Sequence, residues 1–401
     1  MEKRFPLTNK RDHNRAENSN ETGNFFFLRS RWIDLTLAVF WVIGHTLLVF
    51  GDELRLNQIQ VIGTHNSYHI APTPAALQLI ESASRGAGLK LDYTHPPLEE
   101  QFSVLGIRQI ELDVYADPEG GRFAKPFSYR MLNAVGGDAG PNPDPDGSLL
   151  KPGFKILHVP DIDYRTTVRS LRDALQQIQK WSLDHPTHVP LLILMELKDE
   201  EIKGLTQPIK FTPDLLNEID VTIQECFESD HLMTPDDVRK SRDTLREAVL
   251  EDGWPSLVAC RGRVLFALDN EGRLRDDYLA GHPSLAKRVM FVSGRSDASP
   301  EAAFFKINDP LQNHTEIHRL VKQGFLVRTR ADADTQEARA NNTHRREQAF
   351  TSGAQFISTD YPQSDKRFSE YRVRFEGEHT VRPNPVSSRE KVEIVDTPLR
   401  K

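Results

Sequence analysis

Residues 107–114 read Ile-Arg-Gln-Ile-Glu-Leu-Asp-Val, a short apolar run with two acidic residues near its end. Aliphatic residues gathered over so few positions predict a largely buried β-strand. Glu111 and Asp113 are two residues apart, so on a strand they point to the same face, about 6.5 Å from each other. The run therefore predicts a buried strand that carries two carboxylates on one face close to its carboxyl end.

Seven other runs of this kind occur along the chain, and helical patterns such as residues 168–181 and 314–322 lie between them. These runs are Ile59–Gly63, Lys155–His158, Leu191–Leu197, Arg263–Leu268, Arg288–Val292, Phe325–Thr329 and Gln355–Thr359. Strands that alternate with helices are typical of parallel βα units. Eight units predict an α/β fold of the TIM type, a (β/α)₈ barrel.

The composition agrees with one large globular unit. The chain has 401 residues, of which 38% are hydrophobic and 27% charged, and this excludes a wholly disordered or polytopic membrane protein. Lys and Arg number 51 against 58 Asp and Glu, a net charge of -7, so the chain lacks the overall positive charge that nucleic acids attract. The two cysteines, Cys226 and Cys260, are too few for a zinc cluster and can form at most one disulfide.

Polar residues stand at the carboxyl ends of seven of the eight runs. They are His65 and Asn66, Glu111 and Asp113, His158, Glu196 and Lys198, Asp269, Arg328 and Arg330, and Asp360. In a (β/α)₈ barrel the carboxyl ends of the strands meet at one rim, where active sites are built. We therefore expect these residues to lie together although they are distant in sequence. Solvated strand ends are the alternative interpretation.

Three of these carboxylates, Glu111, Asp113 and Glu196, would repel one another at a crowded rim. Either their pKa values rise or a cation joins them. Carboxylate oxygens with an amide carbonyl, and without a thiolate cluster, suit Ca²⁺ or Mg²⁺ better than Zn²⁺. The predicted ligand set for one ion is Asn66, Glu111, Asp113 and Glu196. A salt bridge of Glu196 with Lys198 or an arginine is the alternative.

Several motifs occur in an order that resembles a known family. They are Gly63-Thr64-His65-Asn66-Ser67-Tyr68, Ile110-Glu111-Leu112-Asp113-Val114, His158-Val159-Pro160, Glu196-Leu197-Lys198, Gly253-Trp254-Pro255, Arg328-Thr329-Arg330-Ala331-Asp332, Ser352-Gly353-Ala354-Gln355 and Ser358-Thr359-Asp360-Tyr361-Pro362. Together they resemble the catalytic X-region of phosphoinositide-specific phospholipase C, and most of all its bacterial calcium-dependent branch. The resemblance covers about residues 57–385 and implies the barrel architecture of the phospholipase C-like phosphodiesterases.

The resemblance implies that His65 and His158 are the acid/base pair and that Asn66, Glu111, Asp113 and Glu196 hold Ca²⁺. It also implies the reaction. The inositol 2-hydroxyl of a membrane phospholipid attacks phosphorus, diacylglycerol leaves, and a 1,2-cyclic inositol phosphate forms. Cationic Lys198 and Arg330 are candidates for binding the phosphate or the inositol, together with Asp360. Ordinary ion pairs with Asp360 or Asp269 are the alternative for both cations.

Two other functions compete with this one. A glycerophosphodiester phosphodiesterase on the same barrel also uses a metal-binding Glu and Asp two residues apart, but its first strand normally carries His-Arg-Gly where this chain has Thr64-His65-Asn66. A secreted barrel that binds lipid or sugar without turnover would have no use for buried charged groups that cost stability. The calcium-dependent phospholipase fits the motifs best. We expect no nucleic acid and no obligate protein partner.

The ends of the chain predict location and domain limits. Leu35–Gly51 contains no Asp, Glu, Lys or Arg, follows Arg29 and Arg31, and predicts an export signal or a single membrane anchor, hence a secreted or extracytoplasmic protein. A buried helix is the alternative. We expect residues 1–52 to form this segment, residues 53–385 one barrel domain, and residues 386–401 a loose charged tail. The insertion at about 116–152 contains Phe123 and Phe127, which could touch a lipid surface.

Overall fold

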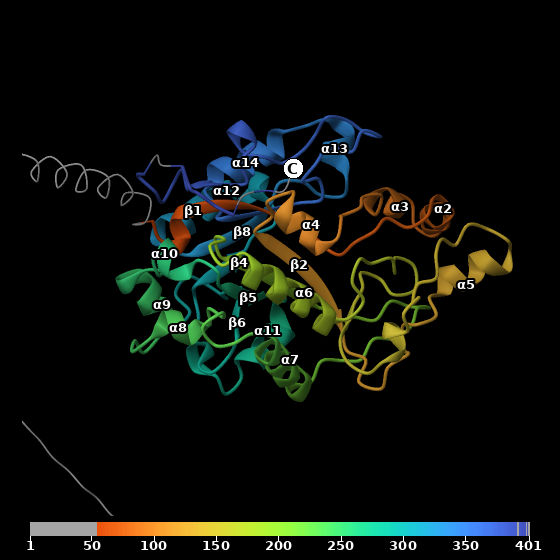
Figure 1. Cartoon of the computed structure of the whole chain (residues 1–401), viewed down its shortest axis with the longest axis horizontal. Helices are drawn as coiled ribbons and strands as arrows, with labels where there is room; N and C mark the ends of the chain where they lie inside the picture. Colours follow the sequence, from red (N-terminus) through yellow and green to blue (C-terminus); the bar gives the residue numbers. More distant parts are fainter. Residues whose placement is uncertain (1–53, 391–392, 398, 400–401) are drawn as a thin grey trace, which may run out of the picture. The chain divides into compact units, whose positions relative to one another are not determined.

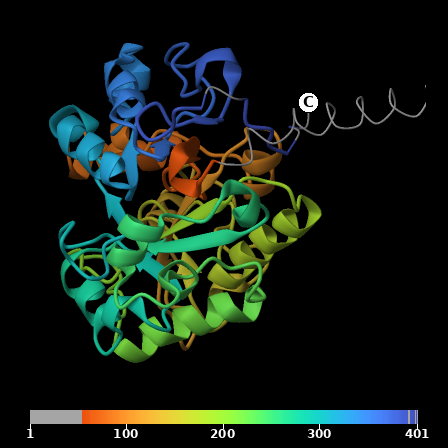
Figure 2. The same cartoon turned by 90° about the vertical axis from the view of Figure 1, so that its left-hand side faces the viewer.

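The computed structural model describes residues 54–390, 393–397 and 399. Its centre is a barrel of eight parallel strands in the order β6-β5-β4-β2-β1-β9-β8-β7 (Figures 1 and 2). The strands are β1 (Ile59–Thr64), β2 (Gln109–Tyr115), β4 (Leu191–Leu197), β5 (Val264–Leu268), β6 (Met290–Val292), β7 (Phe304–Lys306), β8 (Leu326–Arg330) and β9 (Phe356–Thr359). A single parallel bridge between Ser293 and Phe304 joins the two outer strands, so the barrel is nearly closed. The predicted fold class is confirmed.

One of the eight predicted strands is wrong, and another was missed. The run Lys155–His158 contains only the two-residue β3 (Lys155–Ile156), which pairs antiparallel with the end of β2 and lies outside the barrel order. The strand that was missed is β7, which has three residues at the end of the short run Ala302–Lys306. A run this short cannot be distinguished from part of a buried helix by its periodicity.

The helices surround the barrel, as predicted, and most are short. They are α2 (Pro74–Ala83), α3 (Ala87–Lys90), α4 (Leu98–Ser103), α5 (Phe127–Ala134), α6 (Leu171–Asp184), α7 (Pro213–Cys226), α8 (Pro235–Arg239), α9 (Leu245–Glu247), α10 (Leu257–Cys260), α11 (Gly272–Leu279), α12 (Pro310–Gln323), α13 (Gln336–Ala340) and α14 (His344–Ser352). The predicted helix at 168–181 begins later, because the side chain of Ser170 caps α6 by accepting from the backbone N–H of Asp173. The other begins earlier, because Asp309 caps α12.

The insertion after β2 has a small core of its own. This core consists of Tyr115, Phe123, Leu149, Leu157 and Tyr164. Phe123 is buried there, so the suggestion that it touches a lipid surface is wrong. Phe127, at the start of α5, is exposed. Leu157 belongs to the same core, which explains why the run Lys155–His158 is apolar without being a barrel strand.

The amino-terminal end of the barrel is covered by the end of the chain. The strand β10 (Val381–Pro383) pairs antiparallel with β1. Asp396 lies in the segment that we expected to be a loose tail, and its Oδ2 accepts from Nε of the buried Arg108 at 2.7 Å. Its Oδ1 accepts from the backbone N–H of Val189. This part of the tail is therefore held against the barrel.

Two further predictions concern the amino-terminal apolar stretch and the two cysteines. The stretch Leu35–Gly51 lies outside the described residues, so its role as an export signal or anchor stays a prediction. Among the described residues, no helix is both long and apolar enough to cross a bilayer. Cys226 and Cys260 are both buried and free.

Replacing Asp396 with Asn should destabilise the fold by about 2 kcal/mol, because the buried guanidinium of Arg108 loses its charged partner. Glu393→Gln, at an exposed position of the same segment, is the matched control and should change stability by less than about 0.5 kcal/mol. Urea unfolding measures both. Equal stability of Asp396→Asn and the wild type would show that the contact does not hold the tail in solution.

Candidate active site

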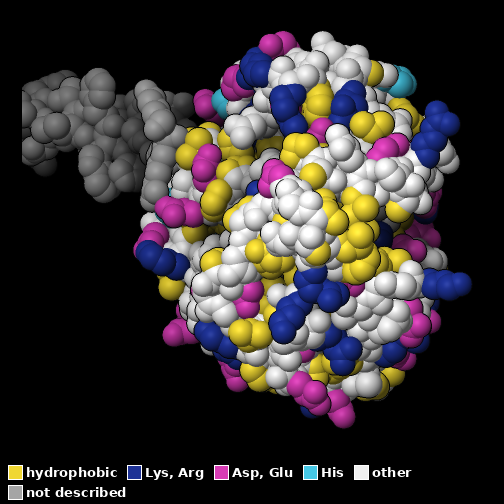
Figure 3. Space-filling view, turned by 90° about the vertical axis from the view of Figure 1, so that its right-hand side faces the viewer, with side chains coloured by type: hydrophobic (Ala, Val, Ile, Leu, Met, Phe, Trp, Pro, Cys, Tyr) yellow, Lys and Arg dark blue, Asp and Glu magenta, His cyan; other side chains and the backbone are white. Residues whose placement is uncertain are grey.

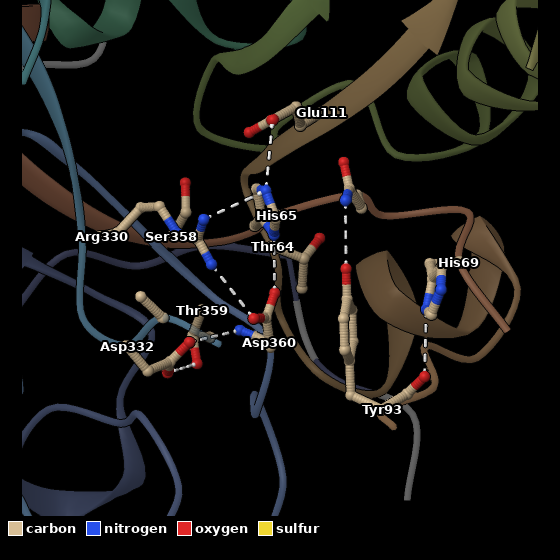
Figure 4. Close-up of polar contacts among 12 residues, drawn as sticks. Thr64, His65, His69, Tyr93, Glu111, Arg330, Asp332, Ser358, Thr359 and Asp360 are labelled. Atoms are coloured by element: carbon tan, nitrogen blue, oxygen red, sulfur yellow. Dashed lines mark hydrogen bonds and ion pairs between the residues drawn. The ribbon is translucent and has the colours of Figure 1, made fainter. Parts of the chain in front are cut away.

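His65 follows the last residue of β1 and is held between groups from three other strands (Figure 4). Its Nδ1 lies 2.8 Å from Oδ1 of Asp360, which follows β9. Its Nε2 lies 3.2 Å from Nη1 of Arg330, the last residue of β8, and 3.7 Å from Oε1 of Glu111 on β2. Strands that are far apart in sequence thus meet around one imidazole at the barrel rim.

These contacts determine where the proton of His65 lies. The carboxylate of Asp360 can only accept, so Nδ1 donates to it. The guanidinium of Arg330 can only donate, so Nε2 accepts and carries a lone pair. Burial and the nearby Arg330 lower the pKa of His65 to about 3, although Asp360 opposes this shift. His65 is therefore a neutral imidazole whose Nε2 accepts from Arg330 and lies 3.7 Å from Oε1 of Glu111.

The predicted carboxylate cluster forms at the rim. Glu111, Asp113 and Glu196 each place one oxygen within 4.8 Å of the others. The parallel register explains this, because Asp113 on β2 pairs with Glu196 on β4, and Glu111 is two residues before Asp113 on the same face. Asn66 lies alongside, since the next residue, Ser67, donates its backbone N–H to the carbonyl of Glu111.

The side chain of Asn66 leaves one buried oxygen open to a polar ligand or a cation. Its backbone has φ 44°, in the left-handed region that asparagine tolerates better than most residues. Its Nδ2 donates to the hydroxyl of Tyr93 at 3.1 Å, while its buried Oδ1 has no hydrogen-bond partner among the described residues. A buried carbonyl oxygen without a donor is costly unless a cation or water meets it.

The cluster is only partly neutralised by the protein's own cations. Lys198 places Nζ 3.0 Å from Oε1 of Glu196 and 3.2 Å from Oδ2 of Asp113, so the salt bridge that we weighed for Glu196 exists. Arg328 donates to Glu111. Within the described part of the chain, neither oxygen of Asp113 accepts a geometrically good hydrogen bond, in spite of the nearby ammonium group.

The pKa values of the cluster reflect this imbalance. Burial raises the pKa of Glu111 to about 8 and that of Asp113 to about 7. Burial would also raise the pKa of Glu196, but Lys198 beside it lowers that pKa below its ordinary value. A further cation among these oxygens, besides Lys198 and Arg328, would relieve the cost of keeping Glu111 and Asp113 ionised. The oxygen-only set of Asn66, Glu111, Asp113 and Glu196 fits Ca²⁺.

His158 reaches the same rim by a different route. It follows β3, which runs back along the end of β2, and Leu157 donates its backbone N–H to the carbonyl of Asp113. The imidazole of His158 lines a cavity of about 480 Å³ together with Glu196 and Lys198. Its Nδ1 lies 2.7 Å from Oδ2 of Asp163. His158 is therefore positioned by an antiparallel hairpin and not by a barrel strand.

The three proposed substrate contacts are already in ion pairs. Arg330 places Nη2 3.1 Å from Asp360, and Asp360 also accepts from His65 and is almost fully buried. Lys198 pairs with Asp113 and Glu196, as described above. Of the pairs that we weighed, Arg330 with Asp360 is present. Asp269 pairs with Lys306 instead, 2.7 Å away.

Sequence reasoning overlooked several members of the site. Arg328 was noted only as a polar strand end, yet it neutralises Glu111 from inside the barrel. His69, Tyr93 and Asp163 had no predicted role, although they lie between the two histidines. Asp163 lies five residues after His158, in the loop that follows the short hairpin. That acidic residue beside a candidate catalytic histidine was the one available signal.

Two imidazoles and a carboxylate cluster at one barrel rim define a site suited to cation-assisted acid–base chemistry. The sequence profile of the family described as phosphoinositide phospholipase C, Ca²⁺-dependent, matches residues 54–385. The chain therefore belongs to the family of calcium-dependent phosphoinositide phospholipases C.

Comparison with solved structures finds related barrels at low identity. A calcium-dependent phosphoinositol-specific phospholipase C from the Gram-negative bacterium Pseudomonas sp. is 16% identical with a TM-score of 0.48, over 83% of this chain and 96% of that chain. A Ca²⁺-dependent phosphatidylinositol-specific phospholipase C from Streptomyces antibioticus is 17% identical with a TM-score of 0.44, over 77% and 95%. No curated protein matches the chain. The family assignment depends on the profile match alone.

Calcium should stabilise the protein more at pH 8 than at pH 6. Carboxyl groups in an unfolded chain have pKa values of about 4, whereas those of Glu111 and Asp113 are raised to about 8 and 7. Between these limits the native state holds protons that the unfolded chain has lost, so the cation-free protein loses stability as the pH rises through this window. A cation makes ionisation favourable. The calcium-induced rise in Tm at pH 8 should therefore exceed the rise at pH 6 by at least about 2 °C.

Differential scanning calorimetry with calcium or a chelator measures this effect. At pH 6, Asp113→Asn should change the Tm of the cation-free protein little, because a protonated Asp113 is neutral like the amide, but it should weaken calcium binding by about 10-fold or more. Magnesium at equal concentration is the control ion and should have the smaller effect. Identical Tm values with calcium and with chelator at both pH values would contradict a calcium site here.

Proposed function

We propose that the protein cleaves phosphatidylinositol in a calcium-dependent reaction to diacylglycerol and an inositol phosphate, by way of a 1,2-cyclic phosphate. The observation that carries the proposal is the neutral imidazole of His65, whose Nε2 accepts from Arg330 and lies 3.7 Å from Glu111, a member of a carboxylate cluster that a cation fits. Family membership supports the substrate class, and the second histidine on the same rim supports acid–base chemistry.

In the proposed reaction, the inositol 2-hydroxyl loses its proton to Nε2 of His65 or to the adjacent Glu111. The new bond joins the 2-oxygen to phosphorus, and the bond from phosphorus to the glycerol oxygen breaks. His158 in its imidazolium form, with Nδ1–H directed to Asp163, donates the proton of Nε2 to the leaving alkoxide and becomes the neutral form protonated at Nδ1. Asn66, Glu111, Asp113 and Glu196 would hold one Ca²⁺, whose charge would lower the pKa of the hydroxyl and balance the negative charge of the phosphate oxygens.

Lys198 and Arg330 are the proposed donors to the phosphate or the inositol. Arg330 already donates to Nε2 of His65, so a substrate oxygen at that point would take over this contact and release the lone pair. Asp360 is buried behind both groups, and we assign it to holding His65 and Arg330 in place. Its predicted contact with the inositol stays a prediction.

Phosphatidylinositol should yield a cyclic inositol phosphate only when calcium is present, and His65→Ala and His158→Ala should each lower turnover by about 10² or more. Phosphorus NMR identifies the products, and circular dichroism checks that the variants fold. Phosphatidylcholine and a glycerophosphodiester are the comparison substrates. Preferred cleavage of the glycerophosphodiester would favour the related phosphodiesterase activity, and binding without any turnover would contradict an enzyme.

We also propose that α5 contacts the lipid surface. Phe127 and Met131 are each 39% exposed and Val135, just after the helix, is 76% exposed. These residues are four apart, so they form one apolar stripe. The helix begins against the loop after His158, because Asp161 accepts from the backbone N–H groups of Phe127 and Ser128. Hydrophobic side chains gather across the middle of the face in Figure 3, on the side where α5 lies in Figure 1.

Val135→Asp should weaken binding to vesicles of phosphatidylcholine and phosphatidylinositol by about 10-fold, since an apolar side chain is replaced by one that repels an anionic surface. Turnover of a short-chain phosphatidylinositol that stays monomeric should not change. Val258→Asp is the matched control, because Val258 is 49% exposed and lies in α10, away from α5 in Figure 1. Equal vesicle binding by both variants would show that the stripe does not face the membrane.

A further inference from the structure

A buried carboxylate is shared between two histidines next to the proposed site. Asp163 places Oδ2 2.7 Å from Nδ1 of His158 and both oxygens 2.9 Å from Nε2 of His69. The side chains of Asp163 and His69 are fully buried, while His158 is 23% exposed toward the rim. Three groups from two separate loops therefore form one hydrogen-bonded chain that ends at the cavity.

The partners of His69 determine its protonation. Nδ1 lies 3.0 Å from the backbone carbonyl of Tyr93, which can only accept (Figure 4), and Nε2 faces the two oxygens of Asp163. An imidazole that meets acceptors at both nitrogens donates from both, which makes it an imidazolium. Its ring also stacks on Tyr93 at 4.3 Å, so it has little freedom to turn.

Asp163 is ionised in this arrangement. Burial alone would raise its pKa, but the two histidines outweigh burial and lower the pKa of Asp163 to about 2. The carboxylate therefore accepts from His158, and Nδ1 of His158 carries the proton. This leaves Nε2 of His158 as the nitrogen for exchange with groups in the cavity. Since His69 balances the charge of Asp163, the carboxylate orients His158 without an unbalanced negative charge beside it.

We propose that Asp163 is a positioning residue for His158, and that His69 is the fixed cation that holds Asp163 in place and ionised. The inference depends on the proposed function, in which His158 protonates the glycerol oxygen as the bond from phosphorus to that oxygen breaks. It assigns a task to two buried residues that make no contact with the carboxylate cluster through their side chains. The chain of groups also explains why a histidine in a loop has one defined orientation.

The experiment compares two leaving groups. Phosphatidylinositol releases an alkoxide that needs a proton, whereas the 4-nitrophenyl ester of inositol 1-phosphate releases a stable anion that does not. Asp163→Asn should lower kcat on phosphatidylinositol by about 10², with KM changed less than about twofold, and kcat on the nitrophenyl ester by less than about fivefold. Equal losses on both substrates, or no loss, would overturn the proposal.

Asp161→Asn is the matched control. Asp161 lies in the same loop and is buried, and its carboxylate accepts from the backbone N–H groups of Phe127 and Thr206. Its replacement should affect both substrates equally when the phosphatidylinositol is the monomeric short-chain form, because α5 then has no lipid surface to contact. If Asp163→Asn does not fold, His69→Gln takes its place, since glutamine keeps one donor to Asp163 without the charge. The same selective loss on phosphatidylinositol is then required.

A spectroscopic measurement separates this inference from the proposed function. In protein labelled with ¹⁵N at histidine, His69 should show two protonated ring nitrogens, and His158 should carry a proton at Nδ1 both in its neutral form and in the imidazolium form that donates from Nε2. Asp163→Asn should abolish the single tautomer of His158. A mixture of tautomers in the wild type would overturn the positioning role even if the enzyme is active. If the wild type cleaves neither substrate, the reaction fails while the geometry remains supported by these signals.

Discussion

The burial of several negative charges at one end of a barrel is the constraint on which the rest of this structure depends. Parallel strands bring their carboxyl ends together, and here those ends carry Glu111, Asp113, Glu196, Asp269 and Asp360. Ionised groups in such a place are stable only with partners. Each of these carboxylates lies within 4 Å of a lysine or arginine side chain, but Asp113 and Glu196 share a single one, Lys198. What is left over is a deficit of positive charge around Asp113, and there a calcium ion fits.

Each of the two histidines of the rim is held at Nδ1 by a buried carboxylate, one at a strand end and the other in a loop. His65 stands at the end of a barrel strand, with Asp360 behind one nitrogen and Arg330 at the other. His158 comes from a hairpin and is held by Asp163, whose charge is balanced by His69. In both cases a buried carboxylate accepts from Nδ1 and leaves Nε2 for chemistry. In the proposed reaction, a neutral base and an imidazole that acts as the acid thus stand at the same rim as the carboxylate cluster.

The sequence alone was sufficient for the fold class, because alternating apolar runs and helical patterns have distinct periods. It was also sufficient for the carboxylate pair on β2, because residues two apart on a strand share a face. The strand assignment failed where runs were shortest. β3 and β7 have two and three residues, and in such runs burial by an added hairpin and burial inside a barrel leave the same apolar pattern. Phe123 was misjudged for a similar reason, since a loop can have a core of its own.

The pattern of apolar and polar residues along the chain thus determined that a parallel barrel would form and that imidazoles and carboxylates would stand at its rim. Only the tertiary structure decided which of these groups touch. The pairing of Arg328 with Glu111, and of Asp163 with both His69 and His158, depends on side-chain reach across strands and loops that no periodicity encodes. Protonation states follow from those contacts, because a buried nitrogen donates or accepts according to the atom in front of it. The chemistry of the rim is therefore a property of the folded packing.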